Sequence, residues 1–142
     1  MKLNIQESGN YLIIEDLKYS YSNDKEDDSY DRNWLNGLIS LKAGKFAGKY
    51  SAYFQTIDFY NLKEQLEILY NDLNGTVKFS TLEDQLKMEF IGDGLGHFQV
   101  DCKAVEEAGV GSELNFIINI DQTDLKSIIN ELIQLTQNLP VR

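Results

Sequence analysis

Apolar and polar residues alternate along three stretches in the second half of the chain. Over Gln85 to Ile91, the apolar residues Leu86, Met88 and Phe90 are separated by the polar residues Gln85, Lys87 and Glu89. A period of two predicts a strand with one buried face and one solvent face. The same pattern continues in two further segments, with apolar residues at Phe98, Val100, Cys102 and Ala104, and then at Leu114, Phe116, Ile118 and Ile120.

Two other segments have the three-and-four spacing of an amphipathic helix. The first begins at Asp58, a residue type that caps helix N-termini, and stops at Asn74-Gly75. The second begins at Asp121 and ends before Pro140, the only proline. The residues expected on the buried sides are Phe59, Leu62, Leu66, Leu69 and Leu73 in the first helix, and Leu125, Ile128, Ile129, Leu132, Leu135 and Leu139 in the second.

The N-terminal part of the chain predicts two hairpins. Residues 2–21 alternate loosely around a Gly9-Asn10 turn, and residues 34–42 and 46–57 flank Ala43-Gly44-Lys45. We therefore predict an α+β fold, with an antiparallel β-sheet built of hairpins and two amphipathic helices packed on one face. A chain of 142 residues fits a single domain over residues 1–142.

The pattern leaves open that the domain consists of two related β-hairpin and helix halves. A shift of 63 residues aligns Gly48 with Gly111, Asp58 with Asp121, and Leu62 with Leu125. An odd shift, however, pairs the apolar face of one strand with the polar face of its counterpart. A β-bulge in one half would be needed to reconcile the two patterns.

Charge is strongly unbalanced, with 23 Asp and Glu against 13 Lys and Arg and a net charge of -10. Such a surface repels nucleic acid and anionic lipid and attracts a basic protein. The segment 23–33 has no aliphatic residue and is expected to be an acidic, solvated loop. Its carboxylates lack the spacing of an EF-hand, so we expect no metal site. They are Asp24, Glu26, Asp27, Asp28 and Asp31.

No group of residues forms a recognisable catalytic set. His97 follows the glycine-rich turn 92–96 and lies on the polar face of its strand, whereas Cys102 lies on the apolar face. We expect a surface or turn-closing role for His97, a buried structural thiol at Cys102, no enzymatic activity and no cofactor. The single cysteine, with no apolar export or membrane-spanning segment, favours the cytoplasm.

Scattered short motifs, read together, are similar to those of a known family. They are Trp34-Leu35, Gly44-Lys45-Phe46, Gly48, Leu62, Gln65-Leu66, Leu69-Tyr70, Leu73-Asn74-Gly75, Leu82-Glu83, Gln85-Leu86, Gly96-His97, Asp121-Gln122-Thr123 and Leu125. Over residues 31–139 the chain resembles the WapI family of bacterial immunity proteins. That family neutralises the C-terminal toxins of wall-associated polymorphic toxin systems.

The resemblance implies a cytoplasmic, non-enzymatic inhibitor of a toxin domain that in related systems is often a nuclease. An acidic surface would attract a nuclease, which is built to hold polyanions. Because aromatic side chains beside charged ones suit an interface, we predict partner contacts at Asp24, Glu26, Asp27, Asp28, Tyr30, Asp31 and Trp34. A small-ligand-binding or hydrolytic domain, with a pocket between helices and sheet, remains the alternative. The oligomeric state and the identity of the toxin stay open.

Overall fold

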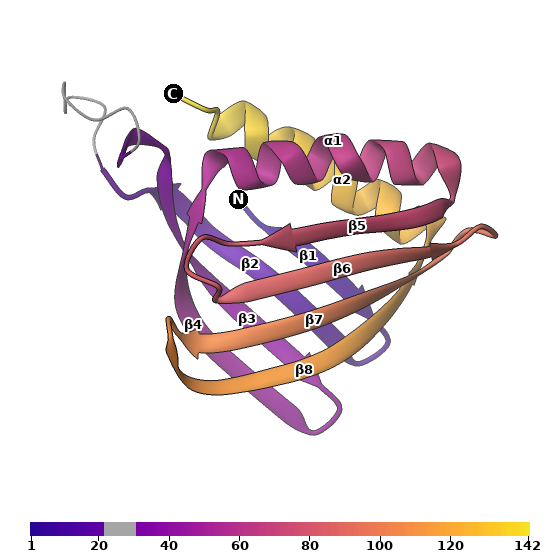
Figure 1. The fold of residues 1–142 in the computed structure, drawn as a ribbon, viewed down its shortest axis with the longest axis horizontal. Coiled ribbons are helices and arrows are strands. Elements are labelled where there is room, and N and C mark those ends of the chain that lie inside the picture. Colours follow the sequence, from indigo (N-terminus) through magenta and orange to yellow (C-terminus); the bar gives the residue numbers. More distant parts are fainter. Residues whose placement is uncertain (22–30) are drawn as a thin grey trace.

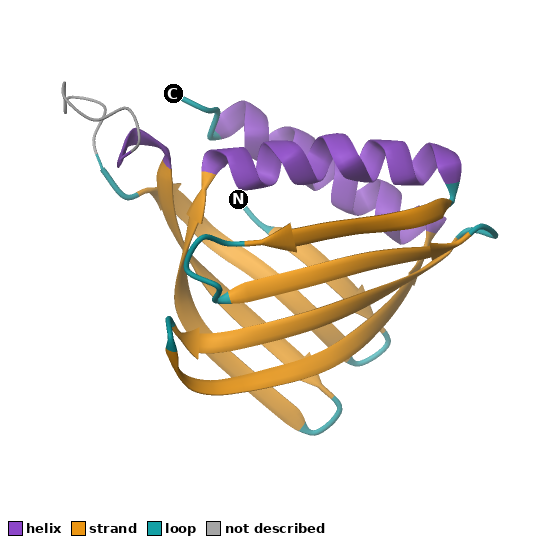
Figure 2. Ribbon diagram, viewed as in Figure 1, coloured by secondary structure: helices purple, strands orange, loops and turns teal. Residues whose placement is uncertain are grey.

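The computed structural model describes residues 1–21 and 31–142, and within them the chain forms eight strands, two α-helices and one short 3-10 helix. Figures 1 and 2 show two sheets that face each other, with both helices along one side. The elements are β1 (Leu3–Glu7), β2 (Asn10–Tyr19), η1 (Asp31–Asn33), β3 (Trp34–Ala43), β4 (Phe46–Gln55), α1 (Thr56–Asp72), β5 (Asn74–Ser80), β6 (Leu86–Asp93), β7 (His97–Glu107), β8 (Val110–Asp121) and α2 (Gln122–Asn138).

The predicted α+β class is confirmed, and the strands divide into two sheets. One sheet has the order β1-β2-β3-β4 and the other β5-β6-β7-β8, with every neighbouring pair antiparallel. The helices α1 and α2 pack against each other, and they also contact β5 and β1 respectively. Together they cover one side of the space between the sheets, where the core lies (Figure 1).

The two halves of the chain have the same element order, four strands followed by a 17-residue helix. Thr56 at the start of α1 corresponds to Gln122 at the start of α2, a displacement of 66 residues. In the preceding hairpins, the facing pair Leu35 and Phe54 corresponds to the facing pair Phe98 and Ile120. Equivalent residues of β3 and β7 are thus 63 positions apart, whereas equivalent residues of β4 and β8 are 66 positions apart. With these two displacements, the buried face of each strand in the first half aligns with the buried face of its counterpart, and no bulge is needed to align them.

The prediction that Asp58 is the N-cap of the first helix is wrong, whereas Asp121 is the N-cap of the second helix, as predicted. The cap of α1 is Gln55, and Asp58 is the third helical residue, whose Oδ2 accepts a hydrogen bond from the Gln55 backbone N at 2.8 Å. Asp124 occupies the equivalent position in α2 and accepts from the backbone N of the cap residue Asp121 at 3.1 Å. Both helices therefore begin with a capping box. In the comparison of the two halves, Asp58 is equivalent to Asp124 and not to Asp121.

The core confirms the alternation predicted for the second half of the chain. Leu86, Phe90 and Val100 are completely buried, and so are the helix residues predicted to face inward except Leu73 and Leu139, which are partly buried. Three aromatic rings connect the first half to the second. The ring of Phe59 in α1 lies 5.2 Å from that of Phe54 in β4 and 5.9 Å from that of Phe79 in β5, measured between centroids. Such tilted contacts add to the stability that burial of the rings provides.

Gln85, which the alternation assigned to the solvent face, is buried instead, with 5% of its surface exposed. It precedes β6 and lies beside β4, the edge strand of the other sheet. Its Oε1 accepts from the Tyr53 backbone N and its Nε2 donates to the Ser51 carbonyl oxygen, both at 3.2 Å. The amide side chain thus pairs with β4 as a neighbouring strand would, because it offers one acceptor and one donor.

The backbone of Gln85 makes three further hydrogen bonds. Its carbonyl oxygen accepts from the Tyr50 hydroxyl at 2.7 Å and from the Val105 backbone N at 3.0 Å. Its backbone N donates to the Thr81 Oγ1 at 3.1 Å. The single residue Gln85 therefore joins β4 to the loop before β6 and to the end of β7.

Two other strand edges are covered by carboxylates. Glu7 at the end of β1 accepts from the Asn119 backbone N of β8 at 3.0 Å, and Glu131 of α2 accepts from the Asn4 backbone N of β1 at 3.3 Å. Edge strands with unpaired amide groups invite pairing with other chains. Here, acidic side chains satisfy those groups.

Replacing Gln85 with Ala should lower the free energy of unfolding by about 2–3 kcal/mol, because it leaves the Tyr53 N–H and the Ser51 carbonyl without their buried partner. Urea unfolding followed by circular dichroism measures the change. Gln99→Ala, at an exposed site on β7, is the matched control and should change stability by less than about 0.5 kcal/mol. Equal effects of the two substitutions would contradict the assigned role of Gln85.

Candidate functional site

The predicted partner-binding residues lie partly outside the described chain. Asp24, Glu26, Asp27, Asp28 and Tyr30 fall in residues 22–30, about which the structure gives no placement. Asp31 opens the 3-10 helix η1, and Trp34 is the first residue of β3. The described part of the predicted site is therefore the base at which the acidic segment joins the sheet β1-β2-β3-β4.

Arg142 holds the two sides of this base together. Its guanidinium donates to the carbonyl oxygens of Tyr21 at 2.9 Å and Arg32 at 2.8 Å, which stand on either side of the acidic segment. It also stacks on the Tyr19 ring, with 3.6 Å between the guanidinium carbon and the ring centroid. The amide of Asn33 binds the Arg142 backbone N and carbonyl oxygen at 2.7 and 3.1 Å.

Beside this base is a hollow of about 290 Å³, which we call the Trp34 hollow. It is lined by Ser20, Tyr21, Trp34, Tyr53 and Glu83. Trp34 and Tyr53 meet edge to face, with 6.4 Å between ring centroids and an interplanar angle of 89°. Tyr53 has 52% of its surface exposed. The sequence reasoning included Trp34 but missed Tyr53 and Glu83, which come from β4 and from the loop between β5 and β6.

Buried polar atoms without a partner gather around the same hollow. Among the described residues, Ser20 Oγ, Asn36 Oδ1 and Gln55 Nε2 have no hydrogen bond. Ser20 and Gln55 both neighbour Trp34 across the sheet, and Asn36 faces Tyr53. Buried polar groups are nearly always hydrogen-bonded in folded proteins. Of these three residues, only Ser20 lines the hollow.

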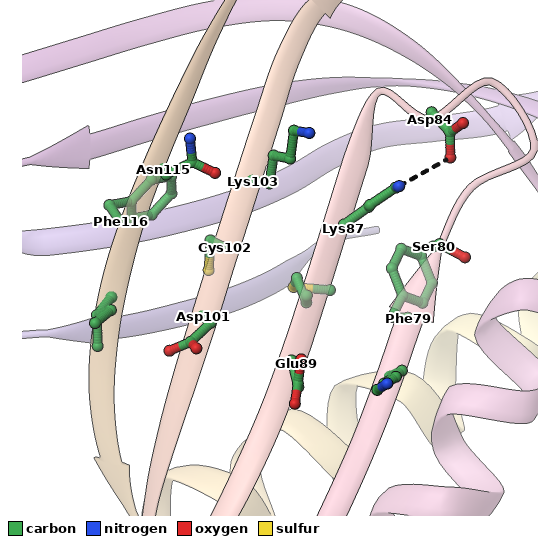
Figure 3. A pocket seen from close by; sticks show the side chains of 13 residues that line it. Phe79, Ser80, Asp84, Lys87, Glu89, Asp101, Cys102, Lys103, Asn115 and Phe116 are labelled. Carbon is green, nitrogen blue, oxygen red and sulfur yellow. Dashed lines mark ion pairs between the residues drawn. The ribbon is translucent and has the colours of Figure 1, made fainter.

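A second hollow, of about 770 Å³, lies on the outer face of the sheet β5-β6-β7-β8 (Figure 3). Lys87 faces Lys103 across β6 and β7, and in the next row Glu89 faces Asp101. Like charges directly opposite each other are unfavourable. Lys87 pairs with Asp84 at 3.7 Å, and Lys103 pairs with Glu113 at 3.2 Å, so the two lysines are partly neutralised by neighbours outside their own row.

A third hollow, of about 460 Å³, holds His97 with the carboxylates of Asp93, Asp121 and Asp124. Asp93 Oδ1 accepts from the Leu95 and His97 backbone N atoms at 2.7 and 3.1 Å, and Asp93 Oδ2 lies 3.2 Å from His97 Nδ1. These contacts hold the pKa of Asp93 below its usual value, with the Leu95 N–H as the largest cause. The geometry is that of a closed turn, which agrees with the turn-closing role predicted for His97.

The carboxylates of this turn do not form a metal centre. In residues 1–21 and 31–142, no group of three or more His, Cys, Asp or Glu side chains is arranged to hold an ion. Asp121 and Asp124 instead bind each other's backbone N atoms at the start of α2.

A smaller hollow of about 260 Å³ lies between α1 and the end of α2, lined by residues that include Tyr60, Lys63, Thr136 and Pro140. No described helix is long and apolar enough to cross a membrane.

The fold and these surface features define an α+β protein of two four-strand-and-helix units. Two solved structures are similar to it in fold. They are MRP1/MRP2 of Trypanosoma bruciei (TM-score 0.52, 11% identity, 99% of this chain and 85% of that chain) and the plant transcriptional regulator PBF-2 (TM-score 0.53, 10% identity, 98% and 81%). No curated protein matches the chain.

A family model assigns the chain more closely than the fold does. The model described as the immunity protein WapI-like family matches residues 2–140, nearly the whole sequence. The protein belongs to the WapI-like immunity protein family.

The buried thiol of Cys102 generates a prediction about reactivity. Burial, with a smaller contribution from the Asp101 charge, raises its pKa to about 12, and only 3% of the residue is exposed. Because the thiolate is the reactive form, labelling by a disulfide reagent at pH 8 should be at least about a hundredfold slower in the folded protein than in urea. Introducing a second thiol at an exposed helix position by Ser127→Cys should add one fast equivalent. Rapid labelling of both thiols would contradict the burial of Cys102.

Proposed function

We propose that this protein is an immunity protein that binds the toxin domain encoded with it and blocks the toxin's active surface, without catalysing a reaction itself. The observation that carries the proposal is the family match over residues 2–140. A nuclease is the toxin class that fits best, because a surface built to hold polyanions would be attracted to a protein of net charge -10. The cytoplasm is where such a toxin would have to be intercepted.

The charge distribution supports contact at one end of the molecule, which we call the acidic end. It comprises Asp31, Glu83, Asp84, Glu106 and Glu107, and segment 23–33 is joined to it in sequence through Asp31. Figure 1 places the β5–β6 connection and the β7–β8 turn at the same end of the molecule as the 3-10 helix η1. Lys42, Lys45 and Lys49 lie at the opposite tip of the β3–β4 hairpin, about 30 Å away by strand length. Carboxylates at the acidic end would attract an approaching basic partner.

Neutralising Asp24, Glu26, Asp27 and Asp28 together, as Asn and Gln, should slow association with the toxin domain by about tenfold at low salt and flatten its salt dependence. Stopped-flow or surface-plasmon measurements with the separately produced toxin domain give both quantities.

Replacing Glu64, Glu67 and Asp72 of α1 is the control, because it removes a similar charge away from the acidic end. It should leave the association rate within about twofold. A toxin that the unaltered protein fails to bind would refute the proposed function. A loop variant that associates at the original rate would remove segment 23–33 from the interface.

The second candidate function is binding of a small polar ligand. The groove on the outer face of β5-β6-β7-β8 supports it, because its volume of about 770 Å³ is that of a ligand site and it presents three lysines, Lys78, Lys87 and Lys103. This groove differs from the pocket between helices and sheet that the sequence suggested.

If the groove holds a ligand, then a metabolite from a screen of nucleotides, sugars and amino acids should raise the melting temperature of the protein, and Lys87→Ala with Lys103→Ala should abolish that shift. Lys45→Ala with Lys49→Ala, at the hairpin tip, should preserve it. A screen in which no compound raises the melting temperature would leave the toxin as the only proposed partner.

A further inference from the structure

We propose that the groove on the outer face of β5-β6-β7-β8 binds a small zwitterion about as long as an extended dipeptide. The carboxylate of this ligand lies at Lys87 and Lys103, and its ammonium group lies at Glu89 and Asp101. The inference rests on the second candidate function, to which it adds the chemistry of the ligand, and it is independent of toxin binding.

Charged side chains in the groove are sorted by sign into two neighbouring rows across the four strands. The registers of the strand pairs put Ser80, Lys87, Lys103 and Asn115 in one row, which we call the donor row. The adjacent row, which we call the carboxylate row, consists of Lys78, Glu89, Asp101 and Ile117. All eight side chains belong to the lining of the groove.

The lysines of the donor row are paired away from the carboxylate row. Figure 3 shows the amino groups of Lys87 and Lys103 directed toward one end of the strands and the carboxylates of Glu89 and Asp101 toward the other. The ion pairs of the two lysines are with Asp84 and Glu113. Within residues 1–21 and 31–142, neither Glu89 nor Asp101 takes part in an ion pair.

Each row therefore attracts a ligand group of the opposite charge. Lys87 directly faces Lys103, and Glu89 directly faces Asp101, and like charges in such positions repel each other. An anionic group beside the two lysines and a cationic group beside the two carboxylates relieve both repulsions. The lysines remain available, because ion pairs between exposed side chains are weak.

The charge balance of the groove favours a zwitterion over a simple anion. Three lysines and three acidic residues line the groove, so its formal charge is zero, whereas the whole protein has a net charge of -10. A nucleotide or another anion is attracted by the donor row but repelled by the carboxylate row and by the protein as a whole. A zwitterion meets the opposite charge at both ends and carries no net charge.

The spacing of the rows sets the length of the ligand. The rows are two residues apart along β6 and β7, which corresponds to about 7 Å. An α-amino acid spans about 3.5 Å and is too short to reach both rows, whereas an extended dipeptide spans about 7 Å. Ile117, with 48% of its surface exposed, adds an apolar surface for a ligand side chain at the end of the carboxylate row. The volume of about 770 Å³ is sufficient for such a molecule.

The experiment titrates the isotope-labelled full chain with the dipeptide Ala-Ala at low salt and follows the backbone amide signals by NMR. Ala-Ala should shift the signals of β6 and β7 in a saturable way. N-acetyl-Ala-Ala, which lacks the ammonium group, and Ala-Ala amide, which lacks the carboxylate, should each bind about fivefold more weakly. Alanine, which has both charges but half the length, should also bind about fivefold more weakly.

Variants assign each end of the ligand to its row. Asp101→Asn and Lys103→Gln should each weaken Ala-Ala about fivefold, with circular dichroism showing that both are folded. Asp101→Asn should not weaken N-acetyl-Ala-Ala further, because that probe has no ammonium group to lose. Glu64→Gln on α1 and Lys45→Gln at the β3–β4 turn make the same changes outside the groove and should leave the affinity unchanged.

Three results would overturn the inference. They are the absence of saturable shifts with Ala-Ala, equal effects of the groove variants and their controls, and binding of N-acetyl-Ala-Ala as tight as that of Ala-Ala. In the last case the ligand is an anion, so the inference fails while the second candidate function stands. Association with the toxin domain is measured separately, so none of these results refutes the proposed immunity function.

Discussion

The amide side chain of Gln85 is the contact on which the rest of the arrangement depends. Two four-stranded sheets that face each other leave β4 with unpaired backbone groups beside the loop that opens the second sheet. Burying those groups unpaired would cost several kcal/mol. Gln85 satisfies one N–H and one carbonyl of β4 with a single side chain, and its own backbone is bound by Tyr50 and Val105. No charged side chain could serve in this way, because none offers both a donor and an acceptor at neutral pH.

The other covered edges show how an acidic protein can use its surplus of carboxylates. Glu131 lies between α2 and β1, and burial raises its pKa, although the hydrogen bond from Asn4 opposes the shift. A raised pKa means that the folded chain binds the proton more tightly than the unfolded chain. The contribution of this group to stability is therefore largest at low pH and falls as the pH rises through the raised pKa. The benefit at neutral pH lies in a covered edge, which hinders pairing with other chains.

The sequence predicts individual elements here much better than their assembly. Alternation located β6, β7 and β8, and helical spacing located α1 and α2, because each period follows from the geometry of one element. The division into two sheets depends on contacts such as Phe59 with Phe79, which no local period encodes. Gln85 was placed on the wrong face for the same reason. It precedes the strand, and its side chain is drawn inward by the unpaired edge of β4.

The candidate site shows the same limit. Trp34 and Asp31 could be proposed from their position beside an acidic segment, whereas Tyr53 comes from β4 and Glu83 from the loop between β5 and β6, and neither could. The two different displacements, 63 and 66 residues, also explain why no single shift aligns the sequences of the two halves throughout. The second hairpin is longer than the first, with strands of 11 and 12 residues against 10 and 10. Asp58 and Asp121 share a residue type and a place near a helix start, but they occupy different positions in their capping boxes.

Dispersed charge and local contacts would contribute differently to binding. Charge at the acidic end acts over a Debye length and mainly raises the rate of encounter, so its effect declines as salt increases. A contact that forms only within the complex mainly lengthens the lifetime of the complex. The two effects can be measured separately, because salt weakens the first much more than the second. An inhibitor of a toxin needs both, since it must intercept the toxin before damage occurs and then retain it. The hydrogen bonds of Gln85 to Tyr53 and Ser51 hold the loop that carries Glu83 against β4, and so fix the position of that carboxylate relative to the rings of Trp34 and Tyr53.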